Sequence, residues 1–153
     1  MSGDGRFSPA VLSRIADGVE TINQNLIDLR ELQRLSWEEY RDDDHRLHRA
    51  AVERTFVQLT AATIDIANSI LSAEGRSVPD HRKTSIVALR ELDVIDEDLE
   101  SRLREAVGFR DVLAHSYGPV VNERIVYDAL QGEIGRYREF VDAVDAYLPS
   151  SED

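Results

Sequence analysis

Apolar residues recur at intervals of three and four along almost the whole chain, and no other sequence feature constrains the fold as strongly. This is the period of an amphipathic α-helix, which buries one side and exposes the other. Stretches in which apolar and polar residues alternate, as they do in a half-buried strand, are almost absent. The pattern therefore predicts an all-α fold, an antiparallel bundle of about five helices.

The first predicted helix runs from Pro9 to about Leu35. Ser8 is a typical N-cap residue, and a proline directly after the cap suits the first helical position. One apolar stripe follows the helix and comprises Val11, Ile15, Val19, Ile22, Leu26 and Leu29. Ser36 and Glu39 then form a capping box for a short helical turn with the sequence WEEY.

The longest predicted helix runs from about Asp44 to Ala73, where Gly75 supplies a left-handed cap. Two apolar stripes follow it, about 120° apart. The first holds Val52, Phe56, Leu59, Ile66 and Ile70, and the second holds Val57, Ile64 and Leu71. Between them runs a thin, more polar stripe of Arg54, Gln58, Ala61, Asp65 and Ser69. Two apolar faces are typical of a central helix.

Three further helices are expected, over about 80–92, 97–114 and 123–147. Asp96 and Asn122 are the N-caps of the second and third, and the Gly118-Pro119 pair ends the second. The residues expected to be buried in the last helix are Ile125, Val126, Ala129, Ile134, Tyr137, Val141, Val144 and Leu148. No linker divides the chain, so one domain over 1–153 is expected, with an ordered core of about 8–148.

The composition excludes several classes of protein. The chain has 153 residues and no cysteine, which rules out disulfides, thiolate nucleophiles and cysteine-bound zinc. No apolar run is long enough to span a membrane and no signal peptide is evident, so a cytoplasmic protein is expected. The net charge of −12 predicts a salt-adapted surface that repels nucleic acid in general, so any phosphate binding must be local.

Arg110 breaks the apolar stripe of the 97–114 helix. That stripe runs through Leu99, Leu103, Ala106, Arg110, Leu113 and then Tyr117, so a cation occupies a position where leucine is expected. A buried guanidinium must face either an acidic partner, such as Asp111 or Asp65, or an anion-binding cleft. His115 lies about 140° around the helix from Arg110. For the two to act together, the helix must unwind near 114–118, or a second copy of the chain must supply the partner.

The segment RDVLAHSY, residues 110–117, matches the RxxxxHxY signature of the HepT toxins, which belong to the HEPN superfamily of small helical ribonucleases. The order of the helices and the segments AVERTFVQLTAATIDIANSIL and IDEDLESRLREAVGFRDVLAHSY also resemble that family. The resemblance covers about residues 8–148. One departure is Asp111, where many relatives carry asparagine.

The resemblance implies a metal-independent endoribonuclease in which the RNA 2′-hydroxyl attacks the adjacent phosphorus. His115 would be the general base or acid, because an imidazole exchanges protons near neutral pH. Arg110 offers a forked pair of donors that matches phosphate oxygens, and Tyr117 would position the substrate. Weaker candidates for positioning the substrate are Asp111, Asp65 and Arg54. No cofactor and no metal are expected.

The resemblance also implies partners. In this family the signature residues of two protomers line one cleft, so a homodimer is expected. An MntA-type nucleotidyltransferase would be the antitoxin and would transfer AMP to Tyr117, and RNA would be the substrate. No membrane partner is expected. The alternative is a non-catalytic helical module that binds a nucleotidyltransferase or a nucleotide. His45 and His48 have a spacing that suits zinc, but no third ligand can be identified, which favours a solvated surface.

Overall fold

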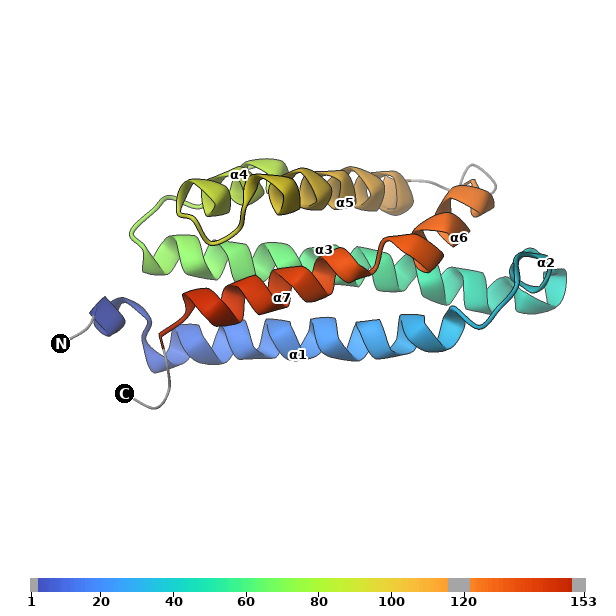
Figure 1. Cartoon of the computed structure of the whole chain (residues 1–153), viewed down its shortest axis with the longest axis horizontal. Coiled ribbons are helices and arrows are strands. Elements are labelled where there is room, and N and C mark those ends of the chain that lie inside the picture. Colours follow the sequence, from blue (N-terminus) through green and yellow to red (C-terminus); the bar gives the residue numbers. More distant parts are fainter. Residues whose placement is uncertain (1–2, 116–121, 150–153) are drawn as a thin grey trace.

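Helices are the only regular secondary structure in the residues that this computed structural model describes, 3–115 and 122–149, and the predicted all-α antiparallel bundle is confirmed (Figure 1). The elements are η1 (Gly3–Arg6), α1 (Pro9–Leu32), α2 (Trp37–Tyr40), η2 (Asp43–His45), α3 (Arg46–Ala73), α4 (Arg82–Glu91), α5 (Glu97–His115), α6 (Glu123–Gly132) and α7 (Gly135–Tyr147). α1 and α3 run side by side along the molecule, and α4, α5 and α7 lie along them.

The predicted caps fix where the helices begin. The hydroxyl of Ser8 accepts a hydrogen bond from a main-chain N–H in the first turn of α1, at 3.2 Å. Ser36 and Glu39 form both hydrogen bonds of a capping box, at 3.1 and 2.9 Å. The carboxylate of Asp96 accepts from the first turn of α5 at 2.8 Å. Each bond satisfies an N–H that has no partner within its helix.

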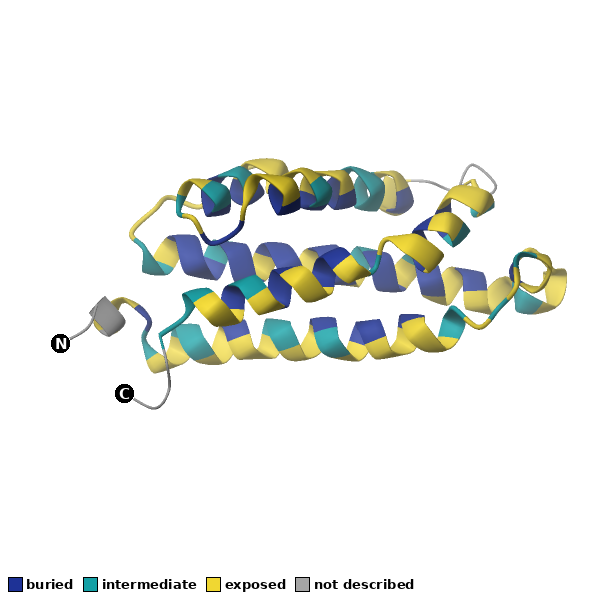
Figure 2. Ribbon diagram, viewed as in Figure 1, coloured by how far each residue is buried: buried dark blue, intermediate teal, exposed yellow. Residues whose placement is uncertain are grey.

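α3 is the central helix, as its two apolar faces predict. It contacts α1, α4, α5, α6 and α7, and its middle is the most buried part of the molecule (Figure 2). It begins at Arg46 rather than Asp44, because Asp42 caps a single 3₁₀ turn just before it, and it ends before Gly75, which has φ +75°. Glycine has no Cβ and adopts that φ readily.

The stretch Asp43–Ala73 is also the one described segment whose length and composition would suit a membrane span. However, 61% of its most apolar window is buried inside the protein. Burial of that kind is expected of the core helix of a bundle, which is hydrophobic nearly all round.

The single helix predicted over 123–147 is wrong, because the structure divides it into α6 and α7. Gly132 and Gly135 flank the break, and two glycines within four residues weaken a helix. α6 tilts away from the line of α7 and reaches α2, where Tyr127 packs on Trp37 with ring centroids 5.5 Å apart. The tilt also leaves Ile125, which was expected to be buried, 56% exposed.

Candidate functional site

Arg110 lies on the inward stripe of α5, between buried Ala106 and Leu113. Its side chain is only 17% exposed, and Nη1 lies 3.2 Å from Oδ1 of Asp111. Its Nε is buried and has no hydrogen-bond partner among the described residues. Of the two acidic partners considered, the structure therefore selects Asp111 and not Asp65. The Arg110 side chain is therefore mostly buried, beside a carboxylate that is nearly half exposed.

His115 is the last residue of α5, so the helix does not unwind before it. Its Nδ1 lies 2.8 Å from the main-chain oxygen of Asp111, one turn earlier. Because a carbonyl oxygen only accepts, Nδ1 must carry the proton of this bond. In the neutral imidazole, Nε2 then keeps a free lone pair. The ring is exposed, so Nε2 is available to take a proton from a ligand.

Asp111 joins the two signature residues. Its carboxylate contacts Arg110 and its carbonyl oxygen contacts His115, so one residue holds both side chains at the exposed end of α5. Arg82 at the start of α4 approaches the same Oδ1, with Nη1 at 4.0 Å. The Asp111 side chain is 46% exposed, so solvent or a ligand reaches this meeting point.

α4 and α5 form an antiparallel pair that brings Arg82 to this place. At the closed end of the pair, Arg90 contacts Glu100 at 2.7 Å. At the open end, Arg82 faces Asp111. Sequence reasoning did not identify Arg82 or its neighbour Lys83 as site residues. The one signal was that Lys83 is the only lysine in the chain.

Tyr117, the third residue of the signature, lies outside the described residues, as do Gly118 and Pro119. Its predicted roles in positioning the substrate and in accepting AMP therefore stay predictions.

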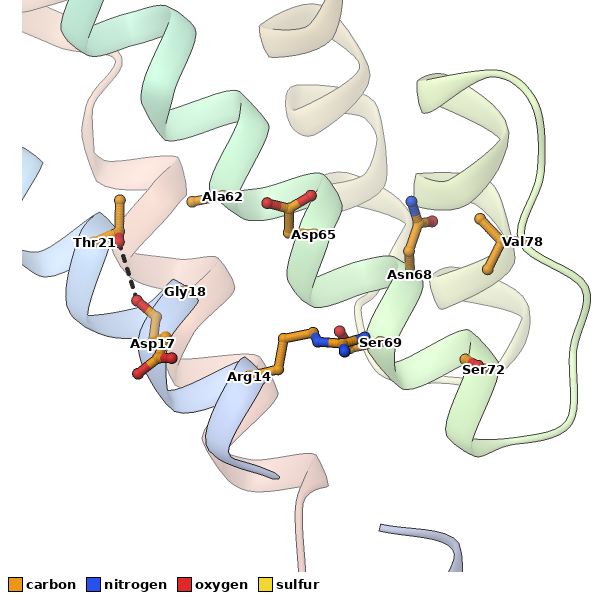
Figure 3. A pocket seen from close by; sticks show the side chains of 10 residues that line it. All are labelled: Arg14, Asp17, Gly18, Thr21, Ala62, Asp65, Asn68, Ser69, Ser72 and Val78. Atoms are coloured by element: carbon orange, nitrogen blue, oxygen red, sulfur yellow. Dashed lines mark hydrogen bonds between the residues drawn. The ribbon is translucent and has the colours of Figure 1, made fainter. Parts of the chain in front are cut away.

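Asp65 and Arg54 lie on exposed positions of α3, and the structure does not bring Asp65 to Arg110. Asp65 lines a cavity of about 420 Å³ between α1 and α3, into which Arg14 reaches from α1 (Figure 3). No residue of α5 lines this cavity. The side chains of Asp65 and Arg54 form no hydrogen bond or ion pair with any described residue. Their roles in positioning the substrate stay predictions.

The helix that follows the signature segment is anchored firmly. Asn122 caps α6, accepting a hydrogen bond from the N–H of Arg124 at 3.0 Å. The buried Arg49 of α3 donates to the carbonyl oxygens of Tyr40 and Asp42, both at 2.7 Å, and contacts Glu123 at 3.4 Å. Arg49 thus ties α2, α3 and the first turn of α6 together.

Two groups beside Arg49 have altered acidity. Burial raises the pKa of Glu53, the charge of Glu123 raises it further, and Arg49 opposes both effects. Burial also raises the pKa of the Tyr40 hydroxyl. Both shifts favour the protonated form of these two side chains.

The rings of His45 and His48 lie next to each other, with centroids 5.2 Å apart and planes inclined at 46°. Within 3–115 and 122–149, no group of three histidine, cysteine, aspartate or glutamate side chains is placed to hold a metal ion.

A sequence model of the protein family described as "Ribonuclease HepT-like" matches residues 22–144. Among curated proteins, the mRNA nuclease HepT of Shewanella oneidensis is 29% identical over 85 residues. That alignment covers 56% of this chain and 63% of the relative, so it spans less than two thirds of the relative's length.

Solved structures share the fold. A chain of a toxin–antitoxin crystal structure with AMP-PNP superposes with a TM-score of 0.79 at 22% identity, covering 88% of this chain and 98% of that one. A tri-AMPylated HEPN toxin of Shewanella oneidensis, in complex with an MNT antitoxin, gives 0.74 at 22% identity, covering 87% and 97%. YutE of Bacillus subtilis, a cytosolic protein of unknown function, gives 0.73 at 16% identity, covering 92% and 96%.

Proposed function

Because the chain belongs to the HepT-like ribonuclease family, we propose that it is a metal-independent endoribonuclease and the toxin of a toxin–antitoxin pair. The observation that carries the proposal is the arrangement at the end of α5. There one residue, Asp111, contacts a mostly buried guanidinium and an exposed imidazole whose Nε2 has no hydrogen-bond partner among the described residues. A cation for phosphate and a group for proton transfer are what RNA cleavage through the 2′-hydroxyl requires.

In the proposed reaction, Nε2 of His115 takes the proton of an RNA 2′-hydroxyl. The 2′-oxygen forms a bond to the adjacent phosphorus, and the bond from phosphorus to the 5′-oxygen breaks. The leaving oxygen takes a proton from a general acid, which gives a cyclic 2′,3′-phosphate and a 5′-hydroxyl. Arg110 donates to the phosphate oxygens and stabilises the charge that develops on them.

We propose a homodimer as the active form. Arg110 and His115 point about 140° apart around a helix that stays regular through His115. Two copies that meet at the ends of their α5 helices would complete each other, and the histidine of the second copy would serve as the general acid. The dimer would also concentrate two arginines in one cleft of an acidic protein.

The proposed partner is an MntA-type nucleotidyltransferase that transfers AMP to Tyr117. The nucleotide phosphate would lie where the substrate phosphate binds and would block the site by bulk and charge. Incubation with such an enzyme and ATP should add AMP to the wild-type chain and not to the Tyr117→Phe variant. Mass spectrometry of the intact protein checks this. Addition of AMP to the variant would contradict the assignment of Tyr117.

The same proposal includes two predictions, one on the extent of the domain and one on the location of the protein in the cell. The whole chain, 1–153, would act as one domain, because the matched region runs through nearly the entire bundle. An RNA substrate would place the protein in the cytoplasm.

The decisive experiment measures RNA cleavage by the purified protein in the presence of EDTA. We expect cleavage by the wild type and a loss of at least about a hundredfold in His115→Ala, because general acid–base catalysis contributes that much or more. Arg110→Ala should lose a similar factor while retaining its helical circular dichroism. The matched control is His48→Ala, which removes an exposed histidine far from α5 in the chain and should leave the rate unchanged.

The second candidate function is a non-catalytic helical module that binds a nucleotidyltransferase. It is favoured by the ion pair between Arg110 and Asp111, which is also what a purely structural arginine would form. A folded wild type that binds the antitoxin and leaves RNA intact would establish this alternative. Unfolding of Arg110→Ala would assign that residue a structural role.

A further inference from the structure

Two arginines approach one carboxylate at the open end of the α4 and α5 pair, and a lysine lies on α5 one helical turn away. Arg110 contacts Oδ1 of Asp111 at 3.2 Å, and Arg82 approaches the same atom at 4.0 Å. Lys83, the next residue of α4, extends over α5 at Gly108, with its Nζ 3.6 Å from where a Cβ on that glycine would lie. Gly108 has no side chain, so the lysine amine lies against the surface of α5, about one helical turn before Asp111.

The charges at this place do not cancel. Among the described residues, Asp111 is the only acidic group that pairs with Arg82 or Arg110, and Lys83 pairs with none. Most other surface arginines have a closer partner of their own, such as Arg76, which contacts Glu91 at 3.0 Å. In a chain of net charge −12, this surface is therefore a local positive excess.

The contact with Asp111 resembles the contact that a phosphate would make. Two guanidinium groups converge on one carboxylate oxygen, and that carboxylate is nearly half exposed. Arginine forks suit phosphate oxygens, and an exposed aspartate side chain can turn into solvent when a stronger anion arrives. Within 3–115 and 122–149, the buried Nε of Arg110 has no hydrogen-bond partner, so the described part of the protein leaves one donor of this guanidinium unused.

We propose that Arg82 and Lys83 form a second phosphate-binding subsite, which takes a backbone phosphate of single-stranded RNA next to the phosphate held by Arg110. This inference rests on the proposed ribonuclease function and extends it to α4. The ligand is a phosphodiester of the chain being cut. In the free protein, the Asp111 carboxylate holds Arg82 and Arg110 near the positions that the RNA would use.

The test measures binding of a fluorescein-labelled single-stranded RNA by fluorescence anisotropy at several salt concentrations. All proteins carry His115→Ala so that the RNA stays intact. Adding Arg82→Ala and Lys83→Ala should weaken binding by tenfold or more. It should also make the slope of log K against log salt shallower by about 1.4, since each phosphate contact on a single strand contributes about 0.7. The matched control adds Arg76→Ala and Arg138→Ala, which remove two exposed cations elsewhere, and should keep the full slope.

Several outcomes would overturn the subsite. They are an unchanged slope in the Arg82 and Lys83 variant, the same change in the control variant, or weaker binding of a partner protein with unchanged binding of RNA. A thermal melt of each protein, with Arg82→Gln and Lys83→Gln as a gentler pair, separates lost contacts from lost folding. If the wild type cleaves RNA but the Arg82 and Lys83 variant keeps the full salt slope of RNA binding, the subsite is contradicted and the proposed ribonuclease function is not. If that variant has a shallower salt slope but the wild type does not cleave RNA, the proposed catalysis is contradicted and the subsite is not.

Discussion

Asp111 performs two tasks with two different oxygens. Its carboxylate contacts Arg110 and Arg82, while its main-chain oxygen accepts from Nδ1 of His115. Any residue at this position would supply the carbonyl oxygen, but only an acid supplies the negative charge. A substitution of the side chain therefore separates the charge from the placement of the imidazole.

Asp111→Asn should strengthen RNA binding about fivefold. The amide oxygen can still accept from Arg110, but one negative charge about 4 Å from the bound phosphate is removed, which is worth about 1 kcal/mol in water. Binding of labelled RNA in the His115→Ala background measures the effect. Asp142→Asn, which removes an exposed acid that contacts Arg138 on α7, is the control and should change nothing. Weaker binding in Asp111→Asn would instead mean that the carboxylate itself contacts the substrate.

At the scale of the helices, the caps and the central place of α3 could be predicted from the sequence, but the exact contacts between neighbouring helices could not. Ser8, Asp96 and Asn122 are caps that any chain would use in the same way, so the starts of α1, α5 and α6 follow from sequence. The break between α6 and α7 had a signal in its two glycines, but its position depends on the contact with α2. The approach of Arg82 to Asp111 depends on how α4 lies on α5, which no local pattern specifies.

α1 and α3 pack closely at Gly18, and a substitution there measures how closely. A Cβ on Gly18 would lie 2.7 Å from Cγ1 of the buried Ile66, so Gly18→Ala should destabilise the fold by about 1 kcal/mol despite alanine's higher helix propensity. Gly108→Ala is the matched control. Its Cβ would meet the end of the flexible Lys83 side chain, Nζ at 3.6 Å and Cε at 4.0 Å, so Gly108→Ala should stabilise the fold by about 0.5 to 1 kcal/mol. Thermal melts measure both, and equal shifts would contradict the close packing.

A bidentate pair joins α5 to α7 and should respond to pH. Arg102 donates to both carboxylate oxygens of Glu139, at 2.6 and 2.8 Å, and these bonds hold the pKa of Glu139 below its ordinary value. A carboxyl whose pKa is lower in the folded protein than in the unfolded chain stabilises the fold fully at pH values above the pKa of the unfolded chain. This stabilisation is lost as the pH falls through the pKa of the folded protein.

Glu139→Gln should therefore cost about 0.5 kcal/mol at pH 7, and nothing once the pH is below the lowered pKa of Glu139. Urea unfolding at a series of pH values measures the difference. The control is Glu31→Gln, which removes an exposed acid that contacts Arg34 near the end of α1. A cost that stays the same at low pH would show that Glu139 acts by packing rather than by charge.

For the whole molecule, the net charge of −12 opposes both the proposed homodimer and the proposed binding of RNA, and salt should affect the two in opposite directions. Two acidic chains repel each other, and salt screens that repulsion, so dimer formation should strengthen as salt rises. Binding of RNA to a small positive surface should weaken over the same range.

Cleavage activity should accordingly be greatest at an intermediate ionic strength. At low protein concentration and low salt, the activity per chain should fall as dimers of 17.3 kDa chains dissociate. Sedimentation velocity and initial rates in the same buffers check the two effects together. A species that remains monomeric at every salt concentration while cleaving RNA would contradict the dimer.

The tilt of α6 brings it against the corner between α1 and α2, around Gln33 and Leu35 (Figure 1). The hydroxyl of Tyr127 donates to the carbonyl oxygen of Leu35 at 2.9 Å. The side chain of Gln33 donates to the carbonyl oxygen of Leu130, and that of Gln131 donates in return to the carbonyl oxygen of Gln33, both at 2.9 Å. Where the chain re-enters the bundle after the signature is thus determined by a corner nearly a hundred residues upstream. Substitutions at that corner should consequently alter the proposed ribonuclease activity, although none of its residues contacts RNA in the proposed reaction.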